Sequence, residues 1–141
     1  MATVISFEEL EIWKLAREFA QAIFLAYSSL EKFNKDFELK NQINASSGSV
    51  MDNIAEGFER GSRNEFVNFL SFAKASAGEA KSQLYRALDR NYLSQEAFEI
   101  LFAKATILCK KIGAFMKYLN SSTYQGSKFK NRTISIQNPK P

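Results

Sequence analysis

The placement of the prolines constrains the fold of this chain more than any other feature of its sequence. Both prolines, Pro139 and Pro141, lie in the last three of the 141 positions. Because proline interrupts a helix more strongly than any other residue, nothing between Met1 and Asn138 prevents long, continuous helices. A chain of this length with 45% hydrophobic residues can also bury a core of its own. These two observations predict an all-α fold made of one domain.

Apolar residues recur at alternating steps of three and four along four segments, which is the pattern of amphipathic helices. We predict one helix from Trp13 to Leu30, one from about Phe37 to Gly57, one from Ser62 to Ala87 and one from Ser94 to Leu119. The first stripe consists of Trp13, Ala16, Ala20, Ile23, Tyr27 and Leu30. The third keeps heptad spacing and consists of Phe66, Leu70, Ala73, Ala77, Ala80, Leu84 and Ala87. The fourth continues through Leu101, Ala105, Leu108, Ile112, Phe115 and Leu119.

The starts of the predicted helices carry capping signals, and the links between the helices are short. Capping boxes are expected at the first and third helices, formed by Ser6 with Glu9 and by Ser62 with Glu65. The short links at 59–61 and 91–93 leave little chain for crossing the molecule, so consecutive helices should lie antiparallel. Residues 1–120 are therefore predicted to form an antiparallel up-down-up-down four-helix bundle.

Phenylalanine is abundant, with 13 in the chain, and several rings fall outside the predicted core stripes. These rings are Phe24, Phe69, Phe72, Phe98 and Phe102. Two interpretations stay open: a bulky core with a few exposed rings, or self-association, because aromatic side chains concentrate at the centres of interfaces.

Polar residues and a glycine lie near the end of the second predicted helix, in the stretch Asn53-Ile54-Ala55-Glu56-Gly57. As a structural motif, Asn53 and Glu56 would make local hydrogen bonds that end the helix, with Gly57 in the left-handed cap conformation. As a functional motif, the same groups would contact a ligand. The small residues at 45–49 form a candidate seam for close contact with another helix.

The chain contains no histidine, which removes several classes of chemistry. Nucleophiles activated by histidine and the histidine-containing di-iron sites of helical bundles cannot be built. A zinc site would have only Cys109 and carboxylates as ligands. Carboxylate chemistry through Glu56 or Glu79 stays open, although no pair of carboxylates stands out. We therefore expect no enzymatic activity, no catalytic residue, no metal and no cofactor.

The sequence also bears on the location of the protein. Its single cysteine cannot form an intramolecular disulfide, and it has neither a signal-peptide pattern nor a run of roughly 18 consecutive apolar residues. We expect a soluble cytoplasmic protein that does not bind a membrane.

Positive charge is concentrated near the C-terminus. The chain carries 19 Lys and Arg against 15 Asp and Glu, and the excess equals the basic residues that follow Asn120, where no acid occurs. These residues are Lys128, Lys130, Arg132 and Lys140. Residues 121–141 are also rich in Ser, Asn, Gln and Thr, which predicts a disordered tail. Such a tail would be either a solubilising end or a basic arm that binds phosphate groups.

A second set of cations belongs to the helical part of the chain: Arg60, Arg63, Lys74 and Lys81. These side chains are candidates for a basic strip, which Glu65 and Glu79 could neutralise. Together with Lys128, Lys130 and Arg132 of the tail, they are the predicted nucleic-acid-binding residues.

Several motifs carry a family resemblance: Phe7-x-x-Leu10-x-Ile12-Trp13-x-x-Ala16, Asn53-Ile54-Ala55-Glu56-Gly57, Arg60 and Glu65-Phe66. They resemble the four-helix-bundle family of intervening-sequence proteins encoded within large-subunit ribosomal RNA genes, over roughly Phe7 to Leu119. The resemblance implies a ring-like homopentamer without known catalytic activity. It also implies kinship with the accessory variability determinant of diversity-generating retroelements, a similar bundle that binds nucleic acid and partners a reverse transcriptase.

Three classes of function remain. The first is a homo-oligomer that associates with structured RNA or DNA through backbone contacts. The second is a protein-interaction scaffold for a nucleic-acid enzyme such as a reverse transcriptase. The third is a weak enzyme that uses carboxylates. No base-reading motif is visible, so the sequence predicts no specific target sequence.

Overall fold

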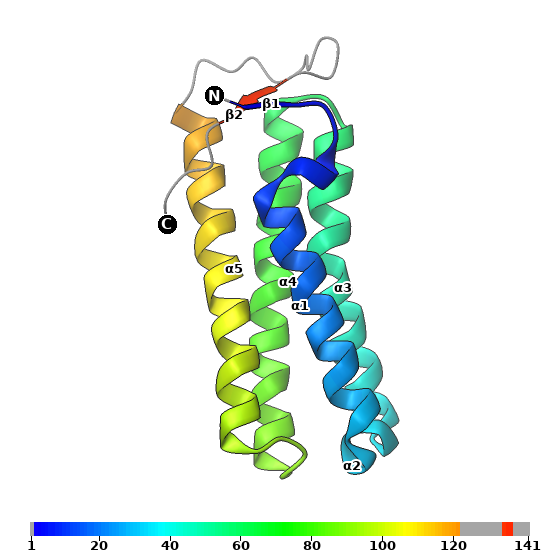
Figure 1. The fold of residues 1–141 in the computed structure, drawn as a ribbon. Coiled ribbons are helices and arrows are strands. Elements are labelled where there is room, and N and C mark those ends of the chain that lie inside the picture. The colour runs from blue at the N-terminus through cyan, green and yellow to red at the C-terminus, as the bar shows by residue number, and fades with distance from the viewer. Residues whose placement is uncertain (1, 122–133, 137–141) are drawn as a thin grey trace.

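The described part of the chain forms four long helices and a few short elements (Figure 1). The computed structural model describes residues 2–121 and 134–136. In chain order the elements are β1 (Ala2–Val4), the 3-10 helix η1 (Phe7–Glu9), α1 (Glu11–Ser29), α2 (Glu31–Lys35), α3 (Phe37–Glu59), α4 (Arg63–Asp89), α5 (Gln95–Ser121) and β2 (Ile134–Ile136). The expectation of a mainly helical chain is confirmed for the described residues.

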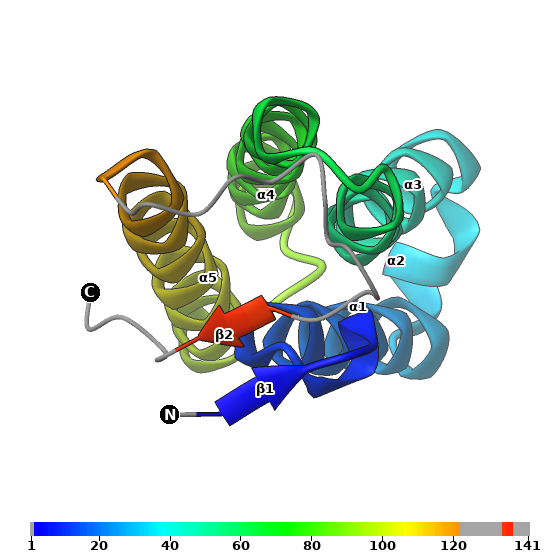
Figure 2. The same cartoon turned by 90° about the horizontal axis from the view of Figure 1, so that it is seen from above.

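The long helices α1, α3, α4 and α5 lie side by side, and each runs in the opposite direction to the long helix before it (Figure 1). Seen along their common direction, α4 lies between α3 and α5, and α1 lies across from α4 (Figure 2). Helix α4 packs extensively against both of its neighbours, whereas α1 touches α5 least among the adjacent long helices. The seam between α1 and α5 is therefore the most open side of the molecule.

The apolar stripes of these helices form the core. Every residue of the stripes predicted for the third and fourth helices is buried, on α4 and α5 respectively. The first stripe is rotated slightly from its predicted position, because α1 buries Ile12 and Phe19 while Trp13 and Ala20 are only half-buried. Phe98, which we expected outside the core, is also buried.

Two of the predicted helix starts are confirmed. The Ser62 hydroxyl accepts a hydrogen bond from the Glu65 backbone N–H at 3.1 Å, and Ser94 caps α5 in the same way through Ala97 at 3.1 Å. The predicted capping box of Ser6 with Glu9 is wrong, because Ser6 precedes the short η1 and makes no side-chain cap. Helix α1 instead begins at Glu11, after Leu10.

A cluster around Asp36, which the sequence did not predict, ties the lower ends of three helices together. The Asp36 carboxylate caps α3 by accepting from the Leu39 N–H at 3.1 Å, and it also accepts from Arg90 at 2.9 Å and Tyr92 at 2.8 Å. Bonds from Leu39, Tyr92 and Arg90 hold the pKa of Asp36 below its ordinary value, against the opposing effect of burial. The short α2 contributes Phe33, whose ring stacks on Tyr92.

Within the predicted tail the structure describes Ser121, which ends α5, and the strand β2. β2 pairs with β1 antiparallel, with Thr3 opposite Ser135, at the upper end of the long helices (Figure 2). Residues 122–133 and 137–141, and with them most of the predicted disordered tail, lie outside the described residues.

Candidate nucleic-acid interface

A polar seam lies between α3 and α4, where the sequence predicted a close contact through residues 45–49. Ser46 is buried and donates to the buried Gln83 of α4 at 2.6 Å. Ser76 of α4 donates to Ser49 at 3.0 Å, and Asn53 donates to the Ser49 carbonyl and hydroxyl at 2.8 Å each. Asn53 therefore supports a network that fixes the two helices in register.

Gly57 lies where α3 packs tightly against α4. A Cβ atom at this position would lie 2.7 Å from the Phe69 Cβ and 3.0 Å from the Phe66 Cδ1. The predicted left-handed cap at Gly57 is wrong, because α3 continues to Glu59 and the described glycine with positive φ is Gly61, at 80°. Gly57 is needed for close packing, and Gly61 makes the turn.

Replacing Asn53 with Ala should lower the free energy of unfolding by about 0.5–1.5 kcal/mol, because a half-buried amide loses its two bonds to Ser49. Asn41→Ala on the exposed face of the same helix is the matched control and should change stability much less. Urea denaturation measures both variants. Equal stabilities for the two variants would refute the structural role of Asn53.

The predicted basic strip is divided between two sides of α4. Arg60 pairs with Glu56 at 3.0 Å and lies 4.9 Å from the centre of the Phe69 ring, on the side that faces α3. The ion pair is exposed on both partners, so its contribution to stability is small. Arg60 is therefore separated from the two lysines of the predicted strip, on the side of α4 that faces α3. Arg63, the first residue of α4, is half-buried.

Lys74 and Lys81 lie on the other side of α4, against α5. The Lys74 carbonyl accepts from the Cys109 thiol at 3.9 Å, and the Lys81 ammonium lies 4.7 Å from the centre of the Phe102 ring. Burial raises the pKa of the Cys109 thiol, while the nearby charges of Lys81 and Lys74 act in the opposite direction. We call the surface formed by Lys74, Lys81 and the adjoining outer side of α5 the α4/α5 face. No described ion pair neutralises either lysine.

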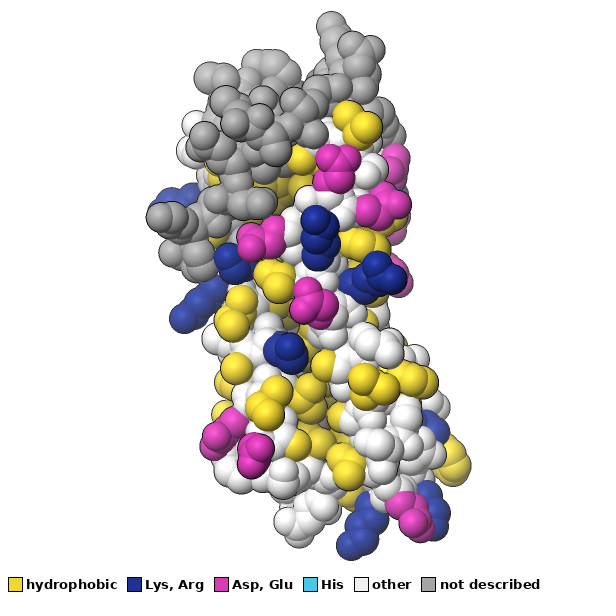
Figure 3. Space-filling model, viewed as in Figure 1, with side chains coloured by type: hydrophobic (Ala, Val, Ile, Leu, Met, Phe, Trp, Pro, Cys, Tyr) yellow, Lys and Arg dark blue, Asp and Glu magenta, His cyan; other side chains and the backbone are white. Residues whose placement is uncertain are grey.

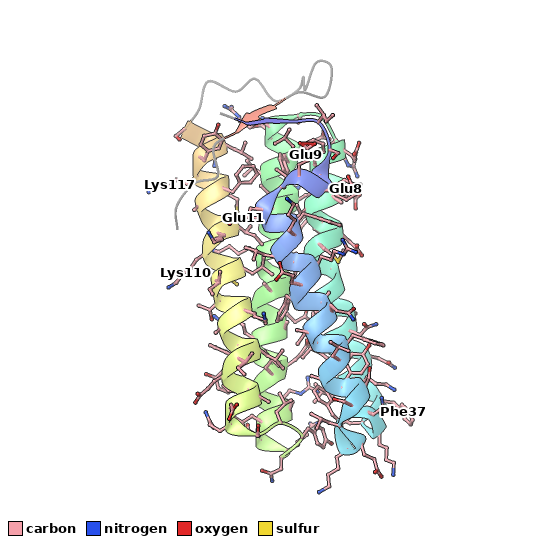
Figure 4. All side chains as sticks on the ribbon, viewed as in Figure 1. Glu8, Glu9, Glu11, Phe37, Lys110 and Lys117 are labelled. Atoms are coloured by element: carbon pink, nitrogen blue, oxygen red, sulfur yellow. The ribbon has the colours of Figure 1, made fainter. Side chains whose placement is uncertain are left out.

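Helix α5 adds cations that the sequence reasoning did not assign to the site. Between Ile100 and Ser121 the chain holds four lysines and no acidic residue. Lys110 and Lys117 are exposed and point outward from the same side of α5, away from α1 (Figure 4). The acid-free run was visible in the sequence, and it could have identified these residues. Glu8, Glu9 and Glu11 lie apart from them, on η1 and α1 (Figure 4).

The remaining predicted cations, Lys128, Lys130 and Arg132, lie outside the described residues. Among residues 2–121 and 134–136, no three metal-ligating side chains come together. The helices in the same ranges are too short or too polar to cross a membrane.

The open seam between α1 and α5 exposes apolar side chains over its lower half (Figure 3). Leu25 on α1 and Ile100 and Ile107 on α5 are each about half exposed. A cavity of about 570 Å³ borders the seam and is lined by Lys14, Arg17, Glu18, Gln21, Ala22, Leu25 and Lys104. We call this surface the α1/α5 face. Phe24 and Phe72, also predicted to lie outside the core, are exposed elsewhere on α1 and α4.

Comparison with known proteins supports the predicted resemblance. A profile described as 23S rRNA-intervening sequence protein matches residues 8–114. A solved structure is also similar, that of a protein of unknown function of the S23 ribosomal protein family from Bacteroides thetaiotaomicron VPI-5482. It shares 28% sequence identity and a TM-score of 0.71, over 75% of this chain and 98% of that one. No curated protein sequence matches the chain.

The profile covers about three quarters of the chain, from η1 into the second half of α5. It therefore includes the Asn53–Gly57 motif, the polar seam and both lysines of the α4/α5 face. Kinship with the retroelement determinant stays a prediction. The chain belongs to the 23S rRNA-intervening sequence protein family.

Proposed function

We propose that this protein is a non-catalytic, homo-oligomeric four-helix bundle, antiparallel and up-down-up-down, that associates with structured RNA or DNA through the phosphate backbone. The observation that carries the proposal is the α4/α5 face, where Lys74 and Lys81 of α4 lie beside the outward-pointing Lys110 and Lys117 of α5. Phosphate contacts by lysine need no base-reading motif, which agrees with the absence of one from the sequence.

The spacing of the two α4 lysines suits a chain of phosphates. Lys74 and Lys81 are seven residues apart, which places them on the same side of the helix about 10 Å apart along its axis. Lys110 and Lys117 repeat that spacing on α5. Two parallel rows of cations would follow a backbone laid along the α4/α5 face.

Self-association is assigned to the α1/α5 face. Exposed Leu25, Ile100 and Ile107 would be buried there by a second copy, and apolar burial favours association. The family resemblance favours a homopentamer of roughly 80 kDa, five times the 16.0 kDa chain. In a ring, the α1/α5 face of each copy would pack on a different surface of the next copy. With that second surface outside the α4/α5 face, the ring would present several copies of the α4/α5 face to one nucleic acid.

A charge-neutralising variant tests the binding face. Replacing Lys74 and Lys81 with Gln should weaken binding to RNA and DNA alike. The dependence of log affinity on log salt should fall by up to about 1.8 for duplex DNA or about 1.4 for single strands per bound subunit. Lys32→Gln with Lys35→Gln on α2 removes the same charge from a distant surface and should change the slope little. An equal effect of the two double variants would refute the assignment of the α4/α5 face.

A protein-interaction scaffold is the second candidate. The cavity on the α1/α5 face favours it, because Lys14, Arg17 and Lys104 surround an apolar floor with a single acid, Glu18. A partner helix with an apolar stripe and acidic flanks would fit such a surface. If purified protein binds neither RNA nor DNA at low salt, this candidate replaces the first.

A further inference from the structure

A group of aromatic rings lies beside Lys81 on the α4/α5 face. The centre of the Tyr85 ring is 5.0 Å from that of Phe98 and 5.3 Å from that of Phe102, and the two phenylalanine rings are 5.2 Å apart. Phe98 is buried and Phe102 half-buried, whereas Tyr85 is 49% exposed. The two inner rings therefore support an outer ring that is open to solvent.

Lys81 lies at the edge of this aromatic group. Its ammonium is 4.7 Å from the centre of the Phe102 ring, a cation–π contact that restricts the lysine side chain. Tyr85 follows Lys81 by four residues, or one helical turn. Lys74 precedes Lys81 by seven residues, or two turns. The side of α4 that faces α5 thus carries two cations followed by an aromatic ring.

We propose that Tyr85, backed by Phe98 and Phe102, stacks on an unpaired base of the nucleic acid whose phosphates contact Lys81 and Lys74. This inference rests on the proposed function and names the class of ligand: RNA or DNA with unpaired bases, such as a loop, a bulge or a single strand. Aromatic rings bind any base by its flat face, and cations alongside neutralise the phosphates. A base inside a duplex is covered on both faces and cannot reach the ring.

Two features favour a nucleic acid over a second copy of the chain as the occupant. The side of α4 that leads to Tyr85 is positively charged through Lys81 and Lys74, so a second copy laid along it would bring like charges together. The more extensive apolar surface lies elsewhere, on the α1/α5 face.

The experiment compares two oligonucleotides with three variants. One oligonucleotide is an RNA hairpin with the fluorescent base 2-aminopurine in its loop, and the other is the same stem as a blunt duplex. Tyr85→Ala should lower affinity for the hairpin about 5- to 150-fold and abolish the fluorescence change that stacking causes, with duplex affinity unchanged. Tyr85→Phe keeps the ring and should bind like the wild type. Phe72→Ala, which removes a ring of nearly equal exposure from the α3 side of α4, is the control for fold.

The outcomes separate the inference from the proposed function. If the wild type binds hairpin and duplex with equal affinity and Tyr85→Ala changes neither, the stacking inference is refuted and backbone binding stands. If Tyr85→Ala reduces the mass of the oligomer in light scattering, Tyr85 is a contact between copies and the inference is wrong. If the wild type binds neither oligonucleotide at low salt, both proposals fail.

Discussion

Gly57→Ala is expected to destabilise the protein by about 2 kcal/mol, although alanine is the better helix former by about 1 kcal/mol. The new methyl would lie 2.7 Å from the Phe69 Cβ, an atom that moves only with the backbone of α4. Helices α3 and α4 would have to separate, and such overpacking costs about 1–3 kcal/mol or more. Separation would also lengthen the bonds that join Ser46 to Gln83 and Ser49 to Ser76.

The matched controls are the glycines in the middle of α3 and α4, where the same change should have the opposite sign. A Cβ at Gly48 or at Gly78 would meet nothing within 4 Å in the chain. Alanine at either position should therefore stabilise the protein by about 0.5–1 kcal/mol. Urea denaturation followed by circular dichroism measures all three variants. A neutral or stabilising Gly57→Ala would contradict the close packing of α3 on α4.

Ile107→Asp should dissociate the oligomer, reducing its mass from roughly 80 kDa to about 16 kDa. The substitution places a charge on the α1/α5 face, where association would have to remove it from water. Leu25→Asp, on the opposite side of the same seam, should act in the same way. Because both side chains are about half exposed in one copy, the isolated chain should keep its helical content.

Ile5→Asp is the control for this prediction, since Ile5 is 62% exposed and lies between β1 and η1, away from the seam. Light scattering at micromolar concentration should give the wild-type mass for this variant. A monomeric wild type would remove the self-association proposal, and an Ile107→Asp variant with unchanged mass would show that another surface joins the copies.

The helices could be predicted from the sequence because their signals are local. The heptad stripe of α4, the cap at Ser62 and the helix start at Ser94 depend on residues a few positions apart, and these predictions are confirmed. Gly57 was assigned wrongly because a glycine near a helix end fits either a cap or a close contact. Only the position of Phe69 on another helix decides between the two.

The candidate site was only partly predictable, because its residues come together through contacts between helices. Arg60 and Lys81 are close in sequence, yet their side chains lie on opposite sides of α4. Arg60 lies over Phe69 on the side that faces α3, whereas Lys81 lies over Phe102 of α5. The aromatic group around Tyr85 joins residues of α4 and α5, so no local pattern indicates it. The pairing of β1 with β2 joins residues more than a hundred positions apart. Such contacts depend on the packing of the whole chain.

The most direct test of the central claim is a salt titration of the full-length protein on RNA and DNA. We include the Lys74→Gln, Lys81→Gln double variant and a second variant in which Lys128, Lys130 and Arg132 are all replaced by Gln. We predict tight binding at low salt, a linear fall of log affinity with log salt, and a smaller slope for the α4/α5 variant. Absence of binding at low salt would contradict nucleic-acid association. A slope reduced only by the tail variant would move the binding site from the α4/α5 face to residues 121–141.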